Sequence, residues 1–169
     1  KDYPCERHAR DARITTIYEG TSQLQVVAAV RGVCSGTAEK LIAEYAQQKY
    51  EPQLSDLLAK LAEGTEQMKK AIAFIKEQGN EYMDLYGRQL VDIAVALICG
   101  YLFCGQASSP ADLQIKSSTE DGSNGEMISM KERKASVARR FITKNAPKIA
   151  ALTEIICTGD KSTFADFKS

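Results

Sequence analysis

The sequence predicts an all-α protein: an antiparallel four-helix bundle preceded by a shorter segment of different character. Apolar residues recur at intervals of three and four over most of the chain, which is the spacing of one helix face. No stretch shows the strict apolar–polar alternation of a half-buried strand. Most connections between the periodic stretches are short, as between antiparallel neighbours in a bundle. We therefore expect the bundle helices near residues 37–49, 53–78, 81–104 and 130–157.

The composition narrows the class of protein. The chain has 169 residues, enough for a domain with a sizeable core. Its 22 basic and 22 acidic residues balance, which gives no support to nucleic acid as a partner and argues against association with a membrane. The longest apolar run, from Ile93 to Cys104, is too short to span a bilayer and predicts a buried helix.

The cysteines and the histidine limit the metal and redox chemistry. The five cysteines are scattered and odd in number, none has the spacing of zinc ligands, and His8 is the only histidine. These features predict that the chain has no metal site. They also favour reduced thiols over a disulfide framework, and therefore a cytoplasmic location.

The first residues of the chain are rich in charge. We expect a loop, then a short helix from Glu6 to Ala12, and then an extended stretch at residues 14–18, which are β-branched or aromatic. His8 is interpreted as a surface side chain because no nucleophile lies near it in sequence. Three arginines are compatible with phosphate or a partner subunit, although a solvated or salt-bridged helix face is preferred: Arg7, Arg10 and Arg13.

A carboxylate at a sharp turn is the most distinctive feature of the next segment. Glu19 is followed by Gly20, which permits a tight turn or a close approach to a ligand. Thr21 or Ser22 can cap a helix that runs from about Ser22 to Cys34. Because a helix N-terminus offers free backbone N–H groups, this arrangement suits an anionic ligand, with ordinary helix punctuation as the alternative. The apolar side of this helix is expected to consist of Leu24, Val27, Ala28 and Val30.

The clearest periodicity lies in the helix expected at residues 53–78. The helix before it, from Thr37 to Tyr50, should be stopped by Pro52. Gly64 should weaken the longer helix locally without changing the phase of its apolar seam. The seam has heptad-like spacing and consists of Leu54, Leu58, Leu61, Thr65, Met68, Ile72 and Ile75.

The helix expected at residues 81–104 repeats this seam and is predicted to be the most buried of all. Gly79 is suited to end the preceding helix, and Asn80 is suited to cap the new one. The stripe consists of Met83, Tyr86, Leu90, Ile93, Leu97, Gly100 and Cys104.

The last third of the chain is predicted to hold a long loop and a long helix. Residues 105–129 are rich in Gly, Ser, Asp and Asn, and we interpret them as a surface loop rather than a binding lid. The final helix, residues 130–157, should be kinked at Pro147 and end before Gly159. Phe164 is expected to pack back on the bundle, together with Phe167. A basic run is a candidate membrane or phosphate patch, although a solvated face is preferred: Lys131, Arg133, Lys134, Arg139 and Arg140.

Three stretches near the N-terminus resemble the last catalytic segment of acyl-CoA dehydrogenases. They are DYPCER at residues 2–7, RDAR at residues 10–13 and IYEGTSQLQ at residues 17–25. The resemblance implies that Glu19 is the general base, which removes the α-proton of an acyl-CoA thioester while the β-hydride passes to the flavin of FAD. It also implies that two residues contact the substrate, Tyr18 and Gly20, and that three contact FAD, namely Thr21, Ser22 and Gln23.

The resemblance also implies a domain organisation and a set of partners. Residues 1–36 would end the catalytic domain of the dehydrogenase, and residues 37–169 resemble, more weakly, the additional C-terminal helical domain of long family members. The parent enzyme would act on an acyl-CoA substrate, pass electrons to an electron-transfer flavoprotein and form a homo-oligomer. The isolated chain would be inactive. The alternative from a different class is a helical interaction or oligomerisation module without activity of its own.

Two effects of opposite sign are expected to act on the pKa of Glu19. A base for a weakly acidic α-proton needs a raised pKa, which burial supplies. A helix N-terminus lowers the pKa of a nearby carboxyl group. The sequence leaves open which effect is larger.

Overall fold

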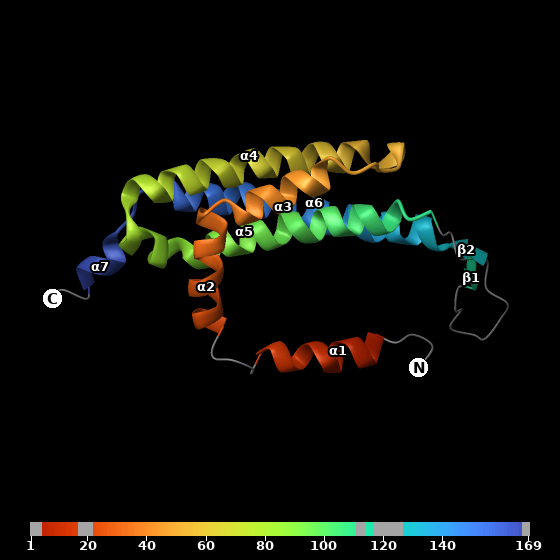
Figure 1. Cartoon of the computed structure of the whole chain (residues 1–169), viewed down its shortest axis with the longest axis horizontal. Coiled ribbons are helices and arrows are strands. Elements are labelled where there is room, and N and C mark those ends of the chain that lie inside the picture. The colour runs from red at the N-terminus through yellow and green to blue at the C-terminus, as the bar shows by residue number, and fades with distance from the viewer. Residues whose placement is uncertain (1–4, 17–21, 111–113, 117–126, 167–169) are drawn as a thin grey trace.

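The computed structural model describes residues 5–16, 22–110, 114–116 and 127–166 (Figure 1). Helices dominate this part of the chain, and the predicted all-α class is confirmed. The helices are α1 (Cys5–Arg13), α2 (Ser22–Cys34), α3 (Thr37–Ala46), α4 (Ser55–Gln78), α5 (Asn80–Ala107), α6 (Met130–Ile156) and α7 (Ser162–Asp166).

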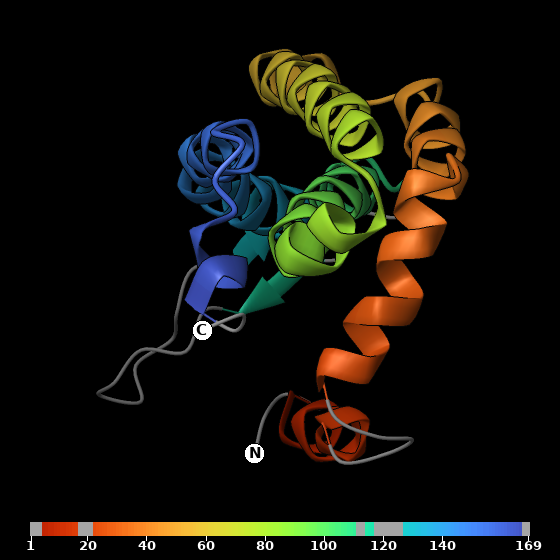
Figure 2. The same ribbon diagram turned by 90° about the vertical axis from the view of Figure 1, so that its left-hand side faces the viewer.

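Four helices run alternately in opposite directions. The chain reverses between α3 and α4, again between α4 and α5, and again between α5 and α6 (Figure 1). Helix α5 is the central element, because it packs against α2, α3, α4 and α6. Helix α2 runs across α5 rather than along it, and α1 lies to one side of the bundle (Figures 1 and 2).

Most of the predicted apolar seam of α4 faces the core, but Leu58 and Thr65 are only half-buried, and Leu57, outside the predicted seam, is fully buried. Leu54, Leu61, Met68 and Ile75 are each at most 3% exposed. The helix begins at Ser55 rather than at residue 53, because residues Pro52–Leu54 form a 3₁₀ turn in which proline is tolerated at the first position.

Glycines in α4 and α5 allow these helices to approach their neighbours closely. A Cβ atom on Gly100 would lie 2.5 Å from Leu61 Cδ2, and one on Gly64 would lie 2.9 Å from Leu97 Cδ2. The expectation that Gly64 only weakens its helix is therefore incomplete, because the missing side chain makes room for Leu97.

Helix α5 is as buried as its sequence predicts. Residues Leu90, Ile93, Leu97 and Cys104 are fully buried. The helix is longer than expected, and by length and composition alone it could cross a membrane, which corrects the expectation that no apolar run is long enough. Its place among four other helices gives this apolar character a role in the core.

The boundary between α4 and α5 lies at Gly79, which has a φ of 92°. That left-handed conformation favours glycine and ends α4 as predicted. Asn80 does not cap α5, because it is already the first helical residue and Gly79 occupies the cap position without a side-chain hydrogen bond.

Helix α6 is capped by Ser129, whose hydroxyl accepts a hydrogen bond from the Glu132 backbone N–H at 3.3 Å. The helix continues through Pro147 to Ile156. Two apolar residues of this helix are exposed, with 44% exposure for Val137 and 46% for Ile155.

Two tyrosine hydroxyls near the start of α5 donate hydrogen bonds to backbone carbonyls at the end of α6 and just after it. The Tyr82 hydroxyl donates to the Ile156 carbonyl at 2.6 Å, and the Tyr86 hydroxyl donates to the Asp160 carbonyl at 2.9 Å. Gly159, with a φ of 75°, ends this region as predicted. Phe164 is half-buried in α7, and Phe167 lies outside the described residues.

The predicted loop at residues 105–129 is wrong at both ends. Helix α5 continues to Ala107, and strands β1 (Gln114–Lys116) and β2 (Met127–Ser129) pair in antiparallel register.

Two further predictions of secondary structure near the N-terminus are corrected by the structure. Residues Ile14–Thr16 form a 3₁₀ helix instead of an extended stretch, and α3 ends at Ala46 instead of Tyr50.

The buried side of α2 also differs from the prediction. Val26, Val30 and Val33 are buried, whereas Leu24 is 61% exposed. Val30 packs where Gly87 of α5 leaves room, since a Cβ atom at Gly87 would lie 3.3 Å from Val30 Cγ2. The inward face of α2 is therefore the one that carries Val26, Val30 and Val33.

Candidate functional site

The predicted catalytic segment lies mostly outside the described residues. Tyr18, Glu19, Gly20 and Thr21 fall in the undescribed range 17–21, and the structure says nothing of their geometry. Ser22 and Gln23 are the first residues of α2, but their side chains are also outside the description. The roles assigned to these six residues remain predictions.

The structure does describe the elements on both sides of that segment. The 3₁₀ helix that ends at Thr16 precedes it, and α2 follows it. Helix α2 is anchored to α5 through Val30, and its N-terminal end extends away from the bundle (Figure 2). Apolar side chains on both flanks are exposed, with 55% exposure for Ile14 and 61% for Leu24.

The charged residues of α1 that the structure describes are on the surface. His8 is exposed, as expected, and so are Arg7, Arg10 and Arg13.

Two residues of the basic run of α6 form ion pairs with acidic residues at the start of α4 and just before it. Arg139 forms a two-pronged ion pair with Asp56 of α4, at 2.5 and 3.1 Å, and Lys131 pairs with Glu51 at 3.0 Å. The Arg139 guanidinium lowers the pKa of the Asp56 carboxyl group. The two ion pairs therefore connect α6 with the start of α4 and the residues just before it.

The described thiols are free. They are Cys34, Cys99, Cys104 and Cys157. Cys104 is completely buried, and burial raises the pKa of its thiol to about 11. In the described ranges, no group of three His, Cys, Asp or Glu side chains could hold a metal ion.

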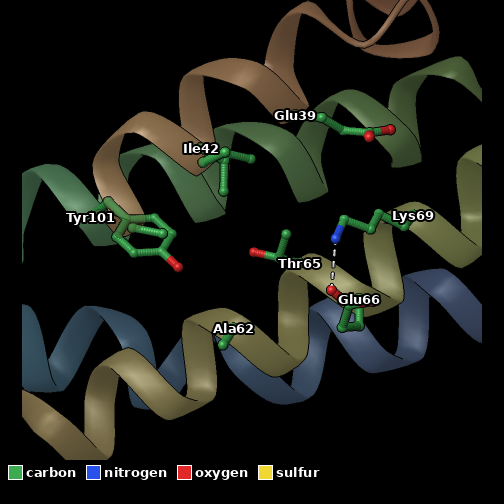
Figure 3. Close-up of a pocket in the computed structure, with 9 residues that line it drawn as sticks. Glu39, Ile42, Ala62, Thr65, Glu66, Lys69 and Tyr101 are labelled. Carbon is green, nitrogen blue, oxygen red and sulfur yellow. Dashed lines mark hydrogen bonds and ion pairs between the residues drawn. The ribbon is translucent and has the colours of Figure 1, made fainter. Parts of the chain in front are cut away.

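A pocket of about 230 Å³ lies between α3, α4 and α5 (Figure 3). It exists because small side chains face one another where α3 and α4 pack, so the space between these helices is not filled. The lining residues are Glu39, Ile42, Ala43, Ala46, Ala62, Thr65, Glu66, Lys69 and Tyr101.

The polar groups of this pocket have distinct surroundings. Tyr101 is only 3% exposed, and its hydroxyl points towards Thr65 (Figure 3). Burial raises the pKa of Tyr101, and the nearby Thr65 hydroxyl partly offsets this effect. Lys69 forms an ion pair with Glu66 at 2.8 Å, while Glu39 acts on Lys69 only at longer range.

The sequence did not predict this pocket. Thr65 was assigned to the apolar seam of its helix, and the seam spacing gave no sign that its hydroxyl faces a cavity. The one available signal was the small size of Ala43, Ala46 and Ala62 on two helices that are consecutive in the chain.

Comparison with known proteins identifies the family. Residues 34–121, more than half of the chain, match the family described as acyl-CoA dehydrogenase C terminal. The chain belongs to the acyl-CoA dehydrogenase C-terminal family. The resemblance stated from the N-terminal motifs is thereby confirmed.

Two known proteins are similar to parts of this chain. A 25-residue stretch is 72% identical to the mitochondrial short-chain specific acyl-CoA dehydrogenase of Bos taurus, which is 15% of this chain but only 6% of that enzyme. The crystal structure of an acyl-CoA dehydrogenase family protein from Porphyromonas gingivalis is similar with a TM-score of 0.60. That match covers 78% of this chain and 97% of the other at 21% identity, and it supports the fold alone.

Proposed function

We propose that this chain is the C-terminal part of an FAD-dependent acyl-CoA dehydrogenase that desaturates an acyl-CoA thioester between its α and β carbons. The observation that carries the proposal is the IYEGTSQLQ motif at residues 17–25, which precedes a domain of the acyl-CoA dehydrogenase C-terminal family. In this proposal the parent protein forms a homo-oligomer in the cytoplasm and passes electrons to an electron-transfer flavoprotein.

Glu19 would act as the base that removes the α-proton of the thioester. Its carboxylate gains this proton while the C–H bond breaks, so a dry surrounding that raises its pKa would favour the reaction. Tyr18 and Gly20 would contact the substrate next to the reacting carbon. The exposed flanking residues Ile14 and Leu24 are apolar surfaces that could help to exclude water when covered.

The residues at the start of α2 would hold FAD, which accepts the hydride when it is bound. The first backbone N–H groups of α2 have no partner within the helix, and such groups suit an anionic part of a cofactor. Thr21, Ser22 and Gln23 would add side-chain hydrogen bonds. A pocket between α5 and α6 has a volume of about 340 Å³, at the lower end for drug-sized ligands, so it does not by itself fit a flavin dinucleotide.

The proposed role of Glu19 is tested by Glu19→Gln in the full-length parent. This change keeps the size of the side chain and removes the base, so FAD should stay bound while an acyl-CoA substrate no longer reduces it. Glu44→Gln, an exposed change on α3, is the matched control and should leave flavin reduction unchanged. Reduction of the flavin at the normal rate in the Glu19 variant would refute the assignment.

A second candidate function is a module for association between subunits. The observation that favours it is the set of exposed apolar side chains along α5 and α6, with 52% exposure for Val95 and 44% for both Leu102 and Val137. Light scattering coupled to size exclusion would show a dimer or larger species of this chain. A monomer over the accessible concentration range would argue against the second function.

A further inference from the structure

We propose that the pocket between α3, α4 and α5 binds a small aliphatic amine in its protonated form. This site is separate from the predicted catalytic segment, since no residue that lines it belongs to residues 17–25.

The size and the apolar lining of the pocket indicate which hydrocarbon part of a ligand fits into it. Ile42, Ala43, Ala46 and Ala62 present methyl groups, and the ring of Tyr101 closes one end (Figure 3). The volume of about 230 Å³ lies below the range of roughly 300–1,000 Å³ that is typical of pockets for drug-sized ligands. A short, unbranched hydrocarbon chain therefore fits, whereas a drug-sized molecule does not.

The charged residues at the mouth of the pocket indicate the charge of the ligand's head group. Glu39 and Glu66 supply two negative charges, and Lys69 supplies one positive charge. Lys69 is already paired with Glu66 at 2.8 Å, which leaves the Glu39 carboxylate with no ion pair among the described residues. The surplus negative charge favours a cation and disfavours a carboxylate.

The inner polar groups add hydrogen-bond acceptors for an ammonium group. The Thr65 hydroxyl donates its proton to the Leu61 carbonyl at 2.8 Å, and its oxygen, which lies beside the Tyr101 hydroxyl, keeps a lone pair for a further donor. The Tyr101 hydroxyl oxygen points to the same space (Figure 3). An ammonium group has three N–H donors and no acceptor, and it matches this set of oxygens.

Three probes of equal chain length test the proposal on the intact chain: n-hexylammonium, n-hexanol and n-hexanoate. Two-dimensional ¹H–¹⁵N NMR should show shifts at Ala43, Ala62 and Thr65 that saturate with n-hexylammonium. The alcohol should bind more weakly, and the carboxylate most weakly of the three. Equal affinities for the three probes, tighter binding of hexanoate, or no saturable shift at these residues would overturn the proposal.

Two pairs of variants separate the charge from the cavity. Glu39→Gln should weaken hexylammonium binding about fivefold and leave hexanol binding unchanged, as expected for one partly exposed charge pair. The control Glu44→Gln, on the same helix and outside the pocket, should change neither.

Ala62→Leu should abolish binding of all three probes because the larger side chain fills the space. Ala59→Leu places the same side chain on an exposed position one turn earlier in α4 and should leave binding intact. Circular dichroism of each variant checks the fold. Unchanged binding in folded Glu39→Gln, or in folded Ala62→Leu, would contradict the assignment.

Discussion

The close packing around Gly100 of α5 predicts that a larger residue at this position destabilises the chain. A Cβ atom there would lie 2.5 Å from Leu61 Cδ2 and 3.4 Å from Ile142 Cγ1. A separation below 3.0 Å is not tolerated, so in Gly100→Ala the Leu61 side chain must move within a packed core. Gly105 lies further along the same helix and provides a matched control, because a Cβ atom there would meet no described residue of a neighbouring element within 4 Å.

The two substitutions should change stability in opposite directions. Alanine is favoured over glycine in a helix by about 1 kcal/mol, while overpacking a core costs about 1–3 kcal/mol. Gly100→Ala should therefore destabilise the chain by roughly 1 kcal/mol. Gly105→Ala, which is close to the end of α5, should stabilise it by about 0.5–1 kcal/mol.

Thermal unfolding followed by circular dichroism measures the difference. A gap of about 2 kcal/mol corresponds to about 4–8 °C in the midpoint for a chain of this length. Leu61→Ala should be less harmful in the Gly100→Ala background than in the wild type, because it removes the clash. If Gly100→Ala were as stable as Gly105→Ala, the close approach of α4 and α5 would be refuted.

Three further predictions concern individual side chains. The pKa of Asp56 is lowered by Arg139, so the stability from this pair is present above the ordinary aspartate pKa of about 4 and is lost as the pH falls through the lower folded-state value. Acid unfolding of Asp56→Asn should therefore lack that component, and an identical acid profile would contradict it. Tyr82→Phe should destabilise the chain by about 1–2 kcal/mol in urea titration, because the Ile156 carbonyl loses a buried partner, and an effect near zero would count against that bond. Cys104 should react with iodoacetamide only after unfolding, because the thiol is buried and its pKa is raised to about 11, and rapid labelling of the folded chain would exclude this environment.

The sequence predicted the long helices best, because their burial repeats over many turns. The seam from Leu54 to Ile75 and the stripe from Tyr86 to Cys104 both face the core. Gly79 predicted the helix boundary because the left-handed backbone conformation that ends α4 favours glycine. These features are local or periodic, and a single sequence contains them in full.

Features that depend on neighbours far along the chain were harder to predict. The inward face of α2 includes Val30, which packs against Gly87 of α5, a contact that short-range spacing does not reveal. The hairpin of β1 and β2 has strands of three residues each, too short to show alternation. The pocket depends on how α3 and α4 pack, which no single helix determines.

The site predictions came from a motif and not from geometry. The motif identified the acyl-CoA dehydrogenase family, and the match over residues 34–121 agrees with it. The roles of Glu19 and its neighbours depend on the surroundings of their side chains, and periodicity carries no information about those.

Anaerobic titration of the full-length parent with acyl-CoAs of different chain length tests the central proposal most directly. We expect one class of acyl-CoA to bleach the visible absorbance of the flavin, and Glu19→Gln to abolish bleaching while FAD remains bound. A parent that binds FAD and is never bleached, or one that is bleached equally well without the Glu19 carboxylate, would contradict it.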